Sequence, residues 1–184
     1  SINMFRSRFP KSMIHSFEPS PSTFETLSRE ASGLKDVKLW NFALGSESGQ
    51  MRLLENSQSV MSSFLHLSEF GWGNLTKETL VDVKTVDDFC NDEKIEKIDI
   101  LKSDTQGFDL EVFKGAEQSI HANRIGLIYF EVIFSDMYKD LPSFAQTYDF
   151  LTSHDFLLVS FYQFHYQRQL ASWTDALFVH KSHV

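Results

Sequence analysis

Residues 98–116, IDILKSDTQGFDLEVFKGA, contain a short apolar run, an abrupt polar turn and the beginning of an amphipathic segment. The run at 98–103 predicts a buried strand, and the polar residues at 104–107 predict the loop that follows it. Gly107 permits a left-handed backbone at the end of that loop. A helix is expected next, because apolar side chains recur at helical spacing in Leu110, Phe113 and Ala116. Strand, loop and helix in this order indicate one unit of a parallel α/β sheet.

The same alternation extends along most of the chain. Apolar or alternating runs predict further strands at 13–17, 37–44, 50–54, 80–84, 125–131, 156–161 and 175–180. Helices are expected from Pro21, after the N-cap residue Thr85 and at 144–153. The polar stretch 55–63 is expected to be a loop. Because strands and helices alternate, we expect a single-domain α/β fold, with a parallel sheet that helices cover on both faces.

The composition is that of an acidic globular protein. Among 184 residues, 17 basic and 25 acidic side chains give a formal net charge of −8. This charge disfavours nucleic acid as a partner, because phosphate binding relies on clustered Lys and Arg. No apolar run in the sequence approaches the roughly 20 residues of a membrane-spanning helix, so we expect no membrane partner. The single cysteine, Cys90, allows no internal disulfide, which favours a reducing compartment and a cytoplasmic location.

Acidic residues follow three of the predicted strands, namely Glu18, Asp104 and Glu131. Ligands of open parallel sheets bind beyond the carboxyl ends of the strands, so these carboxylates are candidate site residues. Glu18 could accept hydrogen bonds from both hydroxyls of a ribose, or it could be a plain loop carboxylate. Asp104 could instead cap the following helix. Glu131 ends a strand too apolar for the surface, so its carboxylate requires a buried partner or a raised pKa.

The seven histidines contain no HxH or HExxH pair, so no metal site is predicted. A hydrolase with a serine nucleophile is disfavoured, because Ser62 and Ser63 lack the GxSxG context. His165 lies among aromatic side chains that could line a substrate pocket, namely Tyr162, Phe164, Tyr166 and Trp173. We therefore treat His165, and Ser63 in the long stretch 55–79, as candidate substrate-binding residues.

Seven short blocks occur in the order expected of one protein family. They read IHSFEPSPSTFETL, NFALGSESGQMRL, SSF, VKTVDDFC, IDILKSDTQGFDLEVFKGA, IYFEV and TDALFV, and they span nearly the entire chain. Each block is unspecific alone, but the order of all seven is specific. The chain therefore resembles the FkbM family of S-adenosylmethionine-dependent methyltransferases. The resemblance implies a Rossmann-like sheet, mostly parallel with an antiparallel last strand, and a small inserted β-hairpin within residues 50–84.

The resemblance also implies roles for individual residues. Glu18 is similar to the family's acidic residue on the cofactor ribose. The stretch expected beside the adenine is matched by Asn41, Ala43 and Leu44. The motif that faces the methionine moiety of S-adenosylmethionine is matched by Asp104, Gln106 and Gly107. Asp104 or Glu131 would be the catalytic base that takes the proton from an acceptor hydroxyl.

One block of the family pattern is not found at the start of the sequence. Family members carry a strand followed by a glycine-rich turn of the form DxGANxG, whereas SINM at residues 1–4 already matches the helix after that turn. We therefore expect an N-terminally truncated domain that lacks the first strand and the glycine-rich loop. Because the amides of such a loop would hold the cofactor's carboxylate, we expect residues 1–184 alone to bind S-adenosylmethionine weakly or not at all.

Two kinds of function are open from the sequence. The first is O-methylation of a hydroxyl on a small molecule or glycan, with S-adenosylmethionine as the methyl donor. The second is a non-catalytic Rossmann-like module that keeps the fold for binding or scaffolding. A metal-assisted hydrolase that uses Asp104, Glu131 and a histidine is a third alternative. The aromatic content leaves room for a self-interface, so a homo-oligomer is an open expectation.

Overall fold

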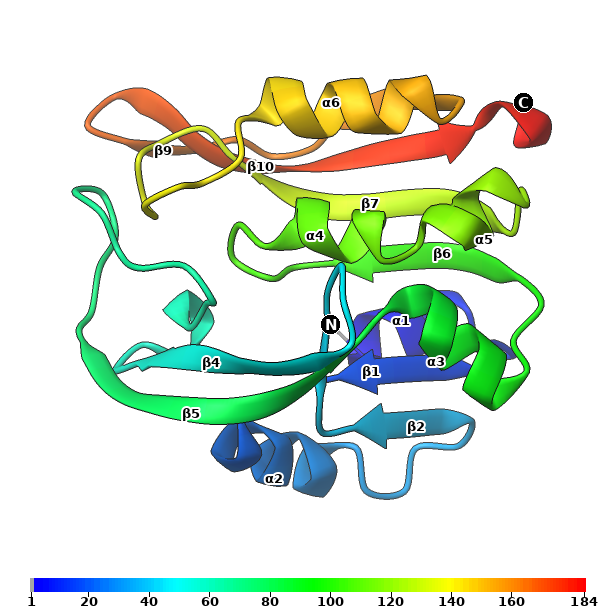
Figure 1. Ribbon diagram of the computed structural model, residues 1–184, viewed down its shortest axis with the longest axis horizontal. Coiled ribbons are helices and arrows are strands. Elements are labelled where there is room, and N and C mark those ends of the chain that lie inside the picture. Colours follow the sequence, from blue (N-terminus) through cyan, green and yellow to red (C-terminus); the bar gives the residue numbers. More distant parts are fainter. Residues whose placement is uncertain (1) are drawn as a thin grey trace.

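The largest of three β-sheets forms the centre of the protein in the computed structural model, which describes residues 2–184 (Figure 1). Its strands are β6 (Ile98–Ser103), β7 (Ile125–Ile133), β10 (Leu170–His180) and β8 (Phe156–Phe161), in that spatial order. The short strand β9 (His165–Gln167) pairs with the beginning of β10. Strands β6 and β7 are parallel, whereas β10 runs antiparallel to β7, β8 and β9. The largest sheet is therefore mixed, and its last strand is antiparallel as expected.

Two smaller sheets are formed by the first half of the chain. Strand β1 (Ile14–Phe17) pairs in parallel with β2 (Val37–Trp40). Strand β3 (Ala43–Leu44) pairs in parallel with β5 (Leu75–Lys84), and β5 pairs antiparallel with β4 (Gly49–Asn56). The single strand expected at 37–44 is therefore wrong, because the chain bends at Asn41 and Phe42 and passes from one sheet to another. The β4–β5 pair is the hairpin that we expected within 50–84.

The helices on one face of the largest sheet supply most of the core. They are α3 (Val86–Glu93), α4 (Asp109–Lys114), α5 (Glu117–His121) and α6 (Phe144–Ser153). Figure 1 shows α4 and α5 in front of β6 and β7, and α6 above β10, where it packs on β8. Buried side chains from these helices, among them Phe113, Ile120 and Leu151, pack on Ile128, Phe130 and Phe178 of the sheet. Thr85 caps α3 as predicted, since its side chain accepts a hydrogen bond from the Asp88 amide at 2.9 Å.

The expected helix after residue 108 is two helices, because α4 and α5 are separated at Gly115. A Cβ atom at Gly115 would lie 2.0 Å from the carbonyl oxygen of Gly45, so only glycine allows this close approach of two backbones. The other face of the largest sheet is less covered than expected. On β8, the side chains of Leu157 and Val159 are 49% and 54% exposed.

The sheet of β1 and β2 is joined to the rest of the protein by aromatic side chains. Among residues 2–184, no backbone pairing connects it to the largest sheet. Phe89 of α3 is 4% exposed, and its ring meets Phe17 edge-on at 4.8 Å and Trp40 at 5.2 Å between centroids. Phe17 and Trp40 thereby pack against the main core. The structure is thus an α/β fold with mixed sheets held together by an aromatic junction.

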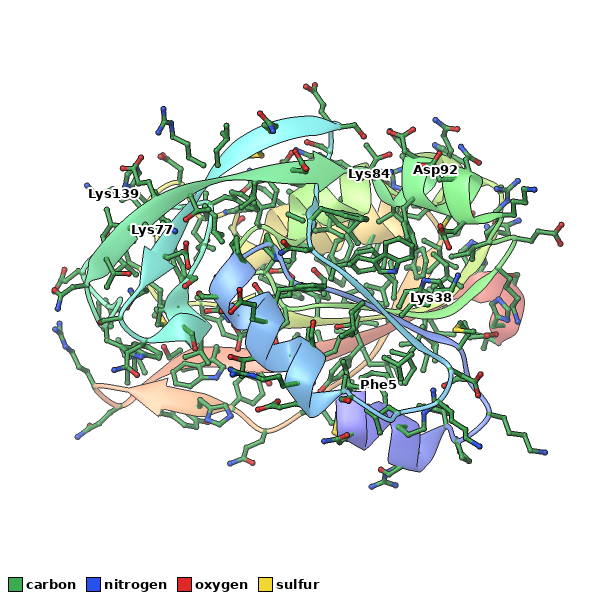
Figure 2. All side chains as sticks on the ribbon, turned by 90° about the horizontal axis from the view of Figure 1, so that it is seen from below. Phe5, Lys38, Lys77, Lys84, Asp92 and Lys139 are labelled. Carbon is green, nitrogen blue, oxygen red and sulfur yellow. The ribbon has the colours of Figure 1, made fainter. Side chains whose placement is uncertain are left out.

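The remaining helices are α1 (Ile2–Arg8), which precedes β1, and α2 (Pro21–Glu30), which follows it. Ser20 caps α2, and Pro21 occupies its first turn as predicted. On the surface, lysines pair with acidic neighbours, as in Lys84–Asp92 at 2.7 Å (Figure 2) and Lys38–Glu93 at 2.9 Å. None of the helices within residues 2–184 has the length and apolar character needed to cross a membrane.

Candidate active site

Gln106 lies at the centre of a polar cluster at the carboxyl end of β6. Its side-chain Nε2 donates to Oδ1 of Asp104 at 3.1 Å and to Oε2 of Glu131 at 3.0 Å. Its Oε1 accepts a hydrogen bond from the Tyr138 hydroxyl at 3.0 Å. Because carboxylates accept and the phenol donates, both ends of the amide are matched by their partners. A single neutral side chain therefore bridges two carboxylates from neighbouring strands.

The backbone around Gln106 is held in a conformation that its residue type does not favour. Gln106 has a φ of 54° and Gly107 a φ of 92°, so two successive residues occupy the left-handed region. The Ser63 hydroxyl donates to the Gln106 carbonyl at 2.8 Å and accepts from the Leu65 amide at 3.1 Å. Ser63 is only 2% exposed. Ser63 therefore holds the Gln106 turn in place through the Gln106 carbonyl. Its role in substrate binding stays a prediction.

Glu131 titrates near neutral pH. The pKa of Glu131 is raised from 4.5 to about 7, mainly by burial and also by the nearby carboxylates of Asp104, Asp109 and Asp175, against the opposing hydrogen bond from Gln106. Asp175 faces Glu131 directly across the β7–β10 pair. The cation nearest to Asp104 is Lys102, whose Nζ lies 2.8 Å from Oδ2. Glu131 therefore has the properties of a proton acceptor that works at physiological pH.

The raised pKa of Glu131 predicts a pH-dependent gain in stability for Glu131→Gln. Below about pH 4.5 the carboxyl is protonated in the folded and unfolded states, so it carries no ionisation penalty. As the pH rises to about 7, the unfolded chain releases this proton more readily than the folded protein, so wild type loses stability. Glutamine keeps the hydrogen bond to Gln106 without the charge. Urea unfolding should show the variant more stable than wild type by up to about 3 kcal/mol at pH 8 and equal to it at pH 4, and a pH-independent difference would contradict the assignment.

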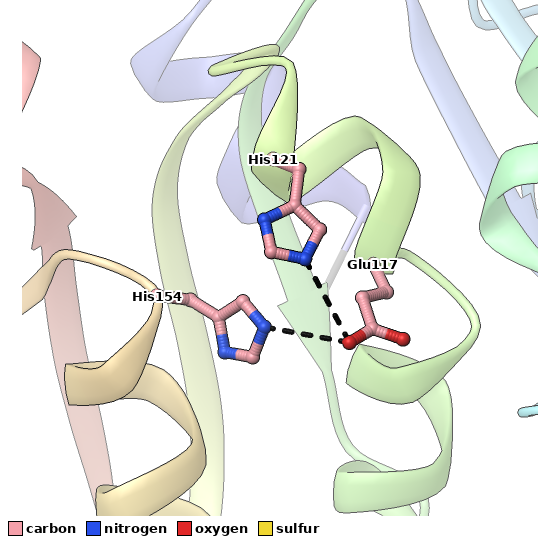
Figure 3. Close-up of side chains that lie close together, drawn as sticks. All are labelled: Glu117, His121 and His154. Atoms are coloured by element: carbon pink, nitrogen blue, oxygen red, sulfur yellow. Dashed lines mark ion pairs between the residues drawn. The ribbon is translucent and has the colours of Figure 1, made fainter.

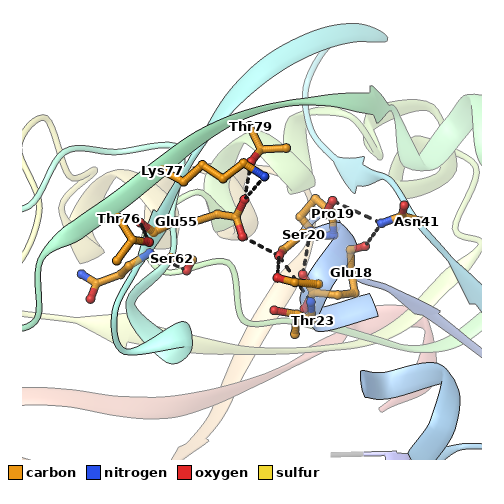
Figure 4. A network of polar contacts seen from close by, with 12 residues as sticks. Glu18, Pro19, Ser20, Thr23, Asn41, Glu55, Ser62, Thr76, Lys77 and Thr79 are labelled. Carbon is orange, nitrogen blue, oxygen red and sulfur yellow. Dashed lines mark hydrogen bonds and ion pairs between the residues drawn. The ribbon is translucent and has the colours of Figure 1, made fainter. Parts of the chain in front are cut away.

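Glu18 lies in a second polar group, at the carboxyl end of β1 (Figure 4). Its Oε1 accepts from the Ser20 amide at 2.8 Å, and its backbone carbonyl accepts from the Asn41 side-chain Nδ2 at 2.8 Å. The Ser20 hydroxyl in turn donates to Oε2 of Glu55 at 2.8 Å, which ties the loop to the β4–β5 hairpin. Burial raises the pKa of Glu18, although the Ser20 amide opposes the shift. The carboxylate is thereby fixed in place and half-buried.

The strands that carry the two polar groups end on the same side of the molecule, since the arrowheads of β1 and β6 point the same way in Figure 1. Of the residues singled out in the sequence, the structure brings together Asp104, Gln106, Gly107, Glu131 and Ser63 in one group, and Glu18 and Asn41 in the other. Ala43 and Leu44 lie in β3, where Ala43 is 5% exposed and Leu44 packs against the core. Their side chains therefore face the protein interior.

His165 is separate from the Gln106 cluster and belongs to an aromatic stack. Its ring is parallel to that of Trp173, with 4.7 Å between the ring centroids, and the ring centroids of Trp72 and Trp173 lie 5.7 Å apart. Trp173 precedes Asp175 by two residues on β10, so both side chains point to the same face of the sheet. His165 thus stands at the rim of the face that carries Glu131, and its role in substrate binding stays a prediction.

Two residues of the Gln106 cluster were missed in the sequence. Asp175 is part of the block TDALFV, and pairing the last strand with 125–131 would have placed it opposite Glu131. Its carboxylate accepts from the Tyr129 hydroxyl at 2.6 Å. Tyr138 lies in a segment without strand or helix periodicity, and no sequence pattern indicates that its hydroxyl reaches Gln106.

Comparison with known sequences identifies relatives of this chain. The family model described as the methyltransferase FkbM domain matches residues 1–158. The 2-O-methyltransferase NoeI of Sinorhizobium fredii is 24% identical over 157 residues, which are 79% of this chain and 64% of that protein. Methyltransferase 1 of Beauveria bassiana is 28% identical over 138 residues, which are 64% of this chain and 55% of that protein. The match thus spans between 55% and 64% of the length of these two relatives.

A solved structure shares the fold. It is the crystal structure of methyltransferase FkbM from Methylobacillus flagellatus, which superimposes with a TM-score of 0.58 and covers 97% of this chain and 40% of that chain. The sequences are 14% identical, so the likeness supports the arrangement of helices and strands and carries no information on the ligand.

Proposed function

Because the chain belongs to the FkbM methyltransferase family, we propose that it is an S-adenosylmethionine-dependent O-methyltransferase with a Rossmann-like topology. The observation that carries the proposal is the Gln106 bridge between Asp104 and Glu131, which places a carboxylate with a pKa of about 7 at the carboxyl edge of the sheet. We propose a hydroxyl of a small molecule or glycan as the acceptor. The name of one relative, 2-O-methyltransferase NoeI, supports transfer to oxygen.

The residues at the carboxyl edge fit the cofactor in part. The half-buried Glu18 carboxylate uses Oε1 to hold the Ser20 amide, and within residues 2–184 no hydrogen bond occupies its other oxygen. That oxygen suits the hydroxyls of a ribose. Asp104 and the Gln106–Gly107 turn, which follow β6 at the same edge, would face the methionine moiety. When bound, S-adenosylmethionine supplies an electrophilic methyl group.

The chain's own residues would prepare the acceptor hydroxyl for attack. Glu131 takes the hydroxyl proton, and Gln106 keeps the Glu131 carboxylate oriented while it does so. Nζ of Lys102 lies 2.8 Å from Oδ2 of Asp104 and pairs with that carboxylate beside Glu131. Methyl transfer from a sulfonium needs an in-line approach more than covalent help, so the fixed position of these groups is the main contribution of the site.

The cofactor assignment predicts that Glu18→Gln weakens the binding of S-adenosylmethionine about 10–100-fold, because a charge-assisted hydrogen bond becomes a neutral one. Isothermal titration calorimetry measures this with a chain that includes any residues its gene encodes before Ser1. Glu30→Gln, an exposed glutamate at the end of α2, is the matched control and should bind like wild type. If the wild-type chain with such residues binds no S-adenosylmethionine, the proposed function is wrong.

A non-catalytic binding module is the second candidate. It is favoured by the small size of the cavity beside Glu131, which Gly107 and Leu141 also line. The volume of this cavity is about 20 Å³, which accommodates one water molecule and is too small for a hydroxylated acceptor. Binding of S-adenosylmethionine without turnover of any hydroxylated acceptor would favour this candidate. For either function we propose a cytoplasmic protein that works without nucleic acid or membrane. We propose that it is able to self-associate through exposed aromatic side chains such as Tyr162 and Tyr166.

A further inference from the structure

A carboxylate and two imidazoles converge at the edge of the sheet opposite the Gln106 cluster (Figure 3). Glu117 and His121 lie one helical turn apart on α5, and their spacing of four residues places both side chains on one face of the helix. His154 immediately follows α6. Nε2 of His154 lies 3.5 Å and Nε2 of His121 lies 3.8 Å from the same oxygen, Oε1 of Glu117. Three potential ligand atoms, two from α5 and one from the residue after α6, therefore surround one point.

The hydrogen bonds of His154 leave its Nε2 with a free lone pair in the neutral ring. Nδ1 lies 2.7 Å from the carbonyl oxygen of Phe150, which can only accept, so Nδ1 carries the proton. The unprotonated Nε2 then points at a carboxylate oxygen, and two acceptors face each other. A cation between them, either a second proton or a metal ion, turns this contact into an attraction. The His154 side chain is 11% exposed, so its direction is fixed by packing.

The spacing and chemistry of these atoms match a transition metal. Around a tetrahedral zinc ion with bonds of about 2.0–2.1 Å, ligand atoms lie about 3.3 Å apart. The three atoms here all lie within 4.8 Å of one another. Small rotations of the exposed side chains of Glu117 and His121 would close the difference. The Nδ1 hydrogen bond of His154 to a backbone carbonyl is also the outer contact that orients metal-binding histidines in general.

We infer that Glu117, His121 and His154 form a binding site for a zinc-like divalent transition metal. Two imidazoles and one carboxylate select such an ion over Mg²⁺ or Ca²⁺, which prefer oxygen ligands. The ion links α5 to the end of α6. Its two histidine ligands, His121 and His154, are 33 residues apart in the sequence. The Glu117–His121–His154 site lies at the amino ends of β7 and β8, whereas Gln106 follows the carboxyl end of β6. The length of a strand, roughly 20 Å, therefore separates the metal site from the Gln106 cluster. The metal therefore stabilises the fold and takes no part in methyl transfer.

The inference is tested by titrating the untagged chain with zinc chloride and following heat and thermal unfolding. We expect one zinc ion per chain, and a rise in Tm of about 5–10 °C when zinc is in 100-fold excess over its dissociation constant. His121→Gln and His154→Gln should each weaken zinc binding roughly 100-fold. Each change removes a direct ligand, and the loss of a residue that only orients a ligand already weakens metal binding by about 10–100-fold. His183→Gln, in the C-terminal 3₁₀ turn, is the matched control and should bind zinc like wild type.

Two further measurements make the result decisive. Circular dichroism without metal establishes that the variants fold, and His121 serves best here because its side chain is 66% exposed. Titration with magnesium chloride should give no heat above dilution. The inference is wrong if wild type binds no zinc, or if His121→Gln and His154→Gln bind it as tightly as wild type does. Because none of these readouts involves S-adenosylmethionine, failure here leaves the proposed function untouched.

Discussion

Replacing Glu131 with glutamine is expected to reduce the rate of methyl transfer by about 10²–10⁴-fold while the protein stays folded. The loss follows from the position of the carboxylate, because Glu131 is the group at this edge whose pKa of about 7 allows it to accept a proton at physiological pH. Glutamine retains the contact with Nε2 of Gln106 but cannot accept the proton. The same change that raises stability above about pH 4.5 therefore removes activity.

The measurement is transfer of a radiolabelled methyl group to whichever hydroxylated small molecule or oligosaccharide gives the highest wild-type rate. The wild-type rate should rise with pH through about 7 as Glu131 ionises, and the variant should lack this rise. Asp136→Asn, an exposed carboxylate beyond β7, is the control for a general effect of lost charge. A variant with wild-type turnover and an unchanged pH profile would show that Glu131 is not the base.

Replacing Phe89 with alanine should lower the free energy of unfolding by about 3–5 kcal/mol. The ring is 4% exposed and contacts Phe17, Trp40 and His15, so its removal opens a cavity where several aromatic rings hold the small sheet against α3. Loss of hydrophobic transfer energy and the cavity act in the same direction. Because Glu18 follows Phe17 directly, we also expect weaker cofactor binding in this variant.

Urea unfolding followed by tryptophan fluorescence measures the change, since Trp40 lies 5.2 Å from the Phe89 ring and reports on the junction itself. Phe9→Ala is the matched control, because Phe9 is 46% exposed and its loss should cost well under 1 kcal/mol. Equal destabilisation in the two variants would mean that the junction contributes no more than an ordinary surface contact.

The strands and helices with strong periodicity could be predicted from the sequence. The strand 98–103, the strand 156–161 and the helix 144–153 have the expected bounds, because each is an apolar or amphipathic run with clear end signals. The division of 37–44 into β2 and β3 could not be predicted. It depends on which strands pair with each half, and pairing is a tertiary choice that local propensity does not contain.

The candidate site was predictable where chemistry follows a strand end and unpredictable elsewhere. Asp104 and Glu131 were found because carboxylates at the ends of apolar runs require an explanation. The bridging amide of Gln106 was implied only as a family match, since its geometry depends on a left-handed turn that glutamine rarely adopts. The cluster of Glu117, His121 and His154 had no sequence signal, because its members come together only when α5 and α6 pack.

The aromatic junction at Phe89 has a consequence for how the two polar groups at the carboxyl edge fit one ligand. Backbone hydrogen bonds lock neighbouring strands into a register, whereas apolar ring contacts are non-directional and tolerate small sliding movements. Glu18 and Gln106 thus follow strands of two different sheets. Within residues 2–184, these sheets are held together by packed aromatic side chains and not by backbone hydrogen bonds. The distance between Glu18 and Gln106 is therefore set by the packing of side chains and not by a shared hydrogen-bond register.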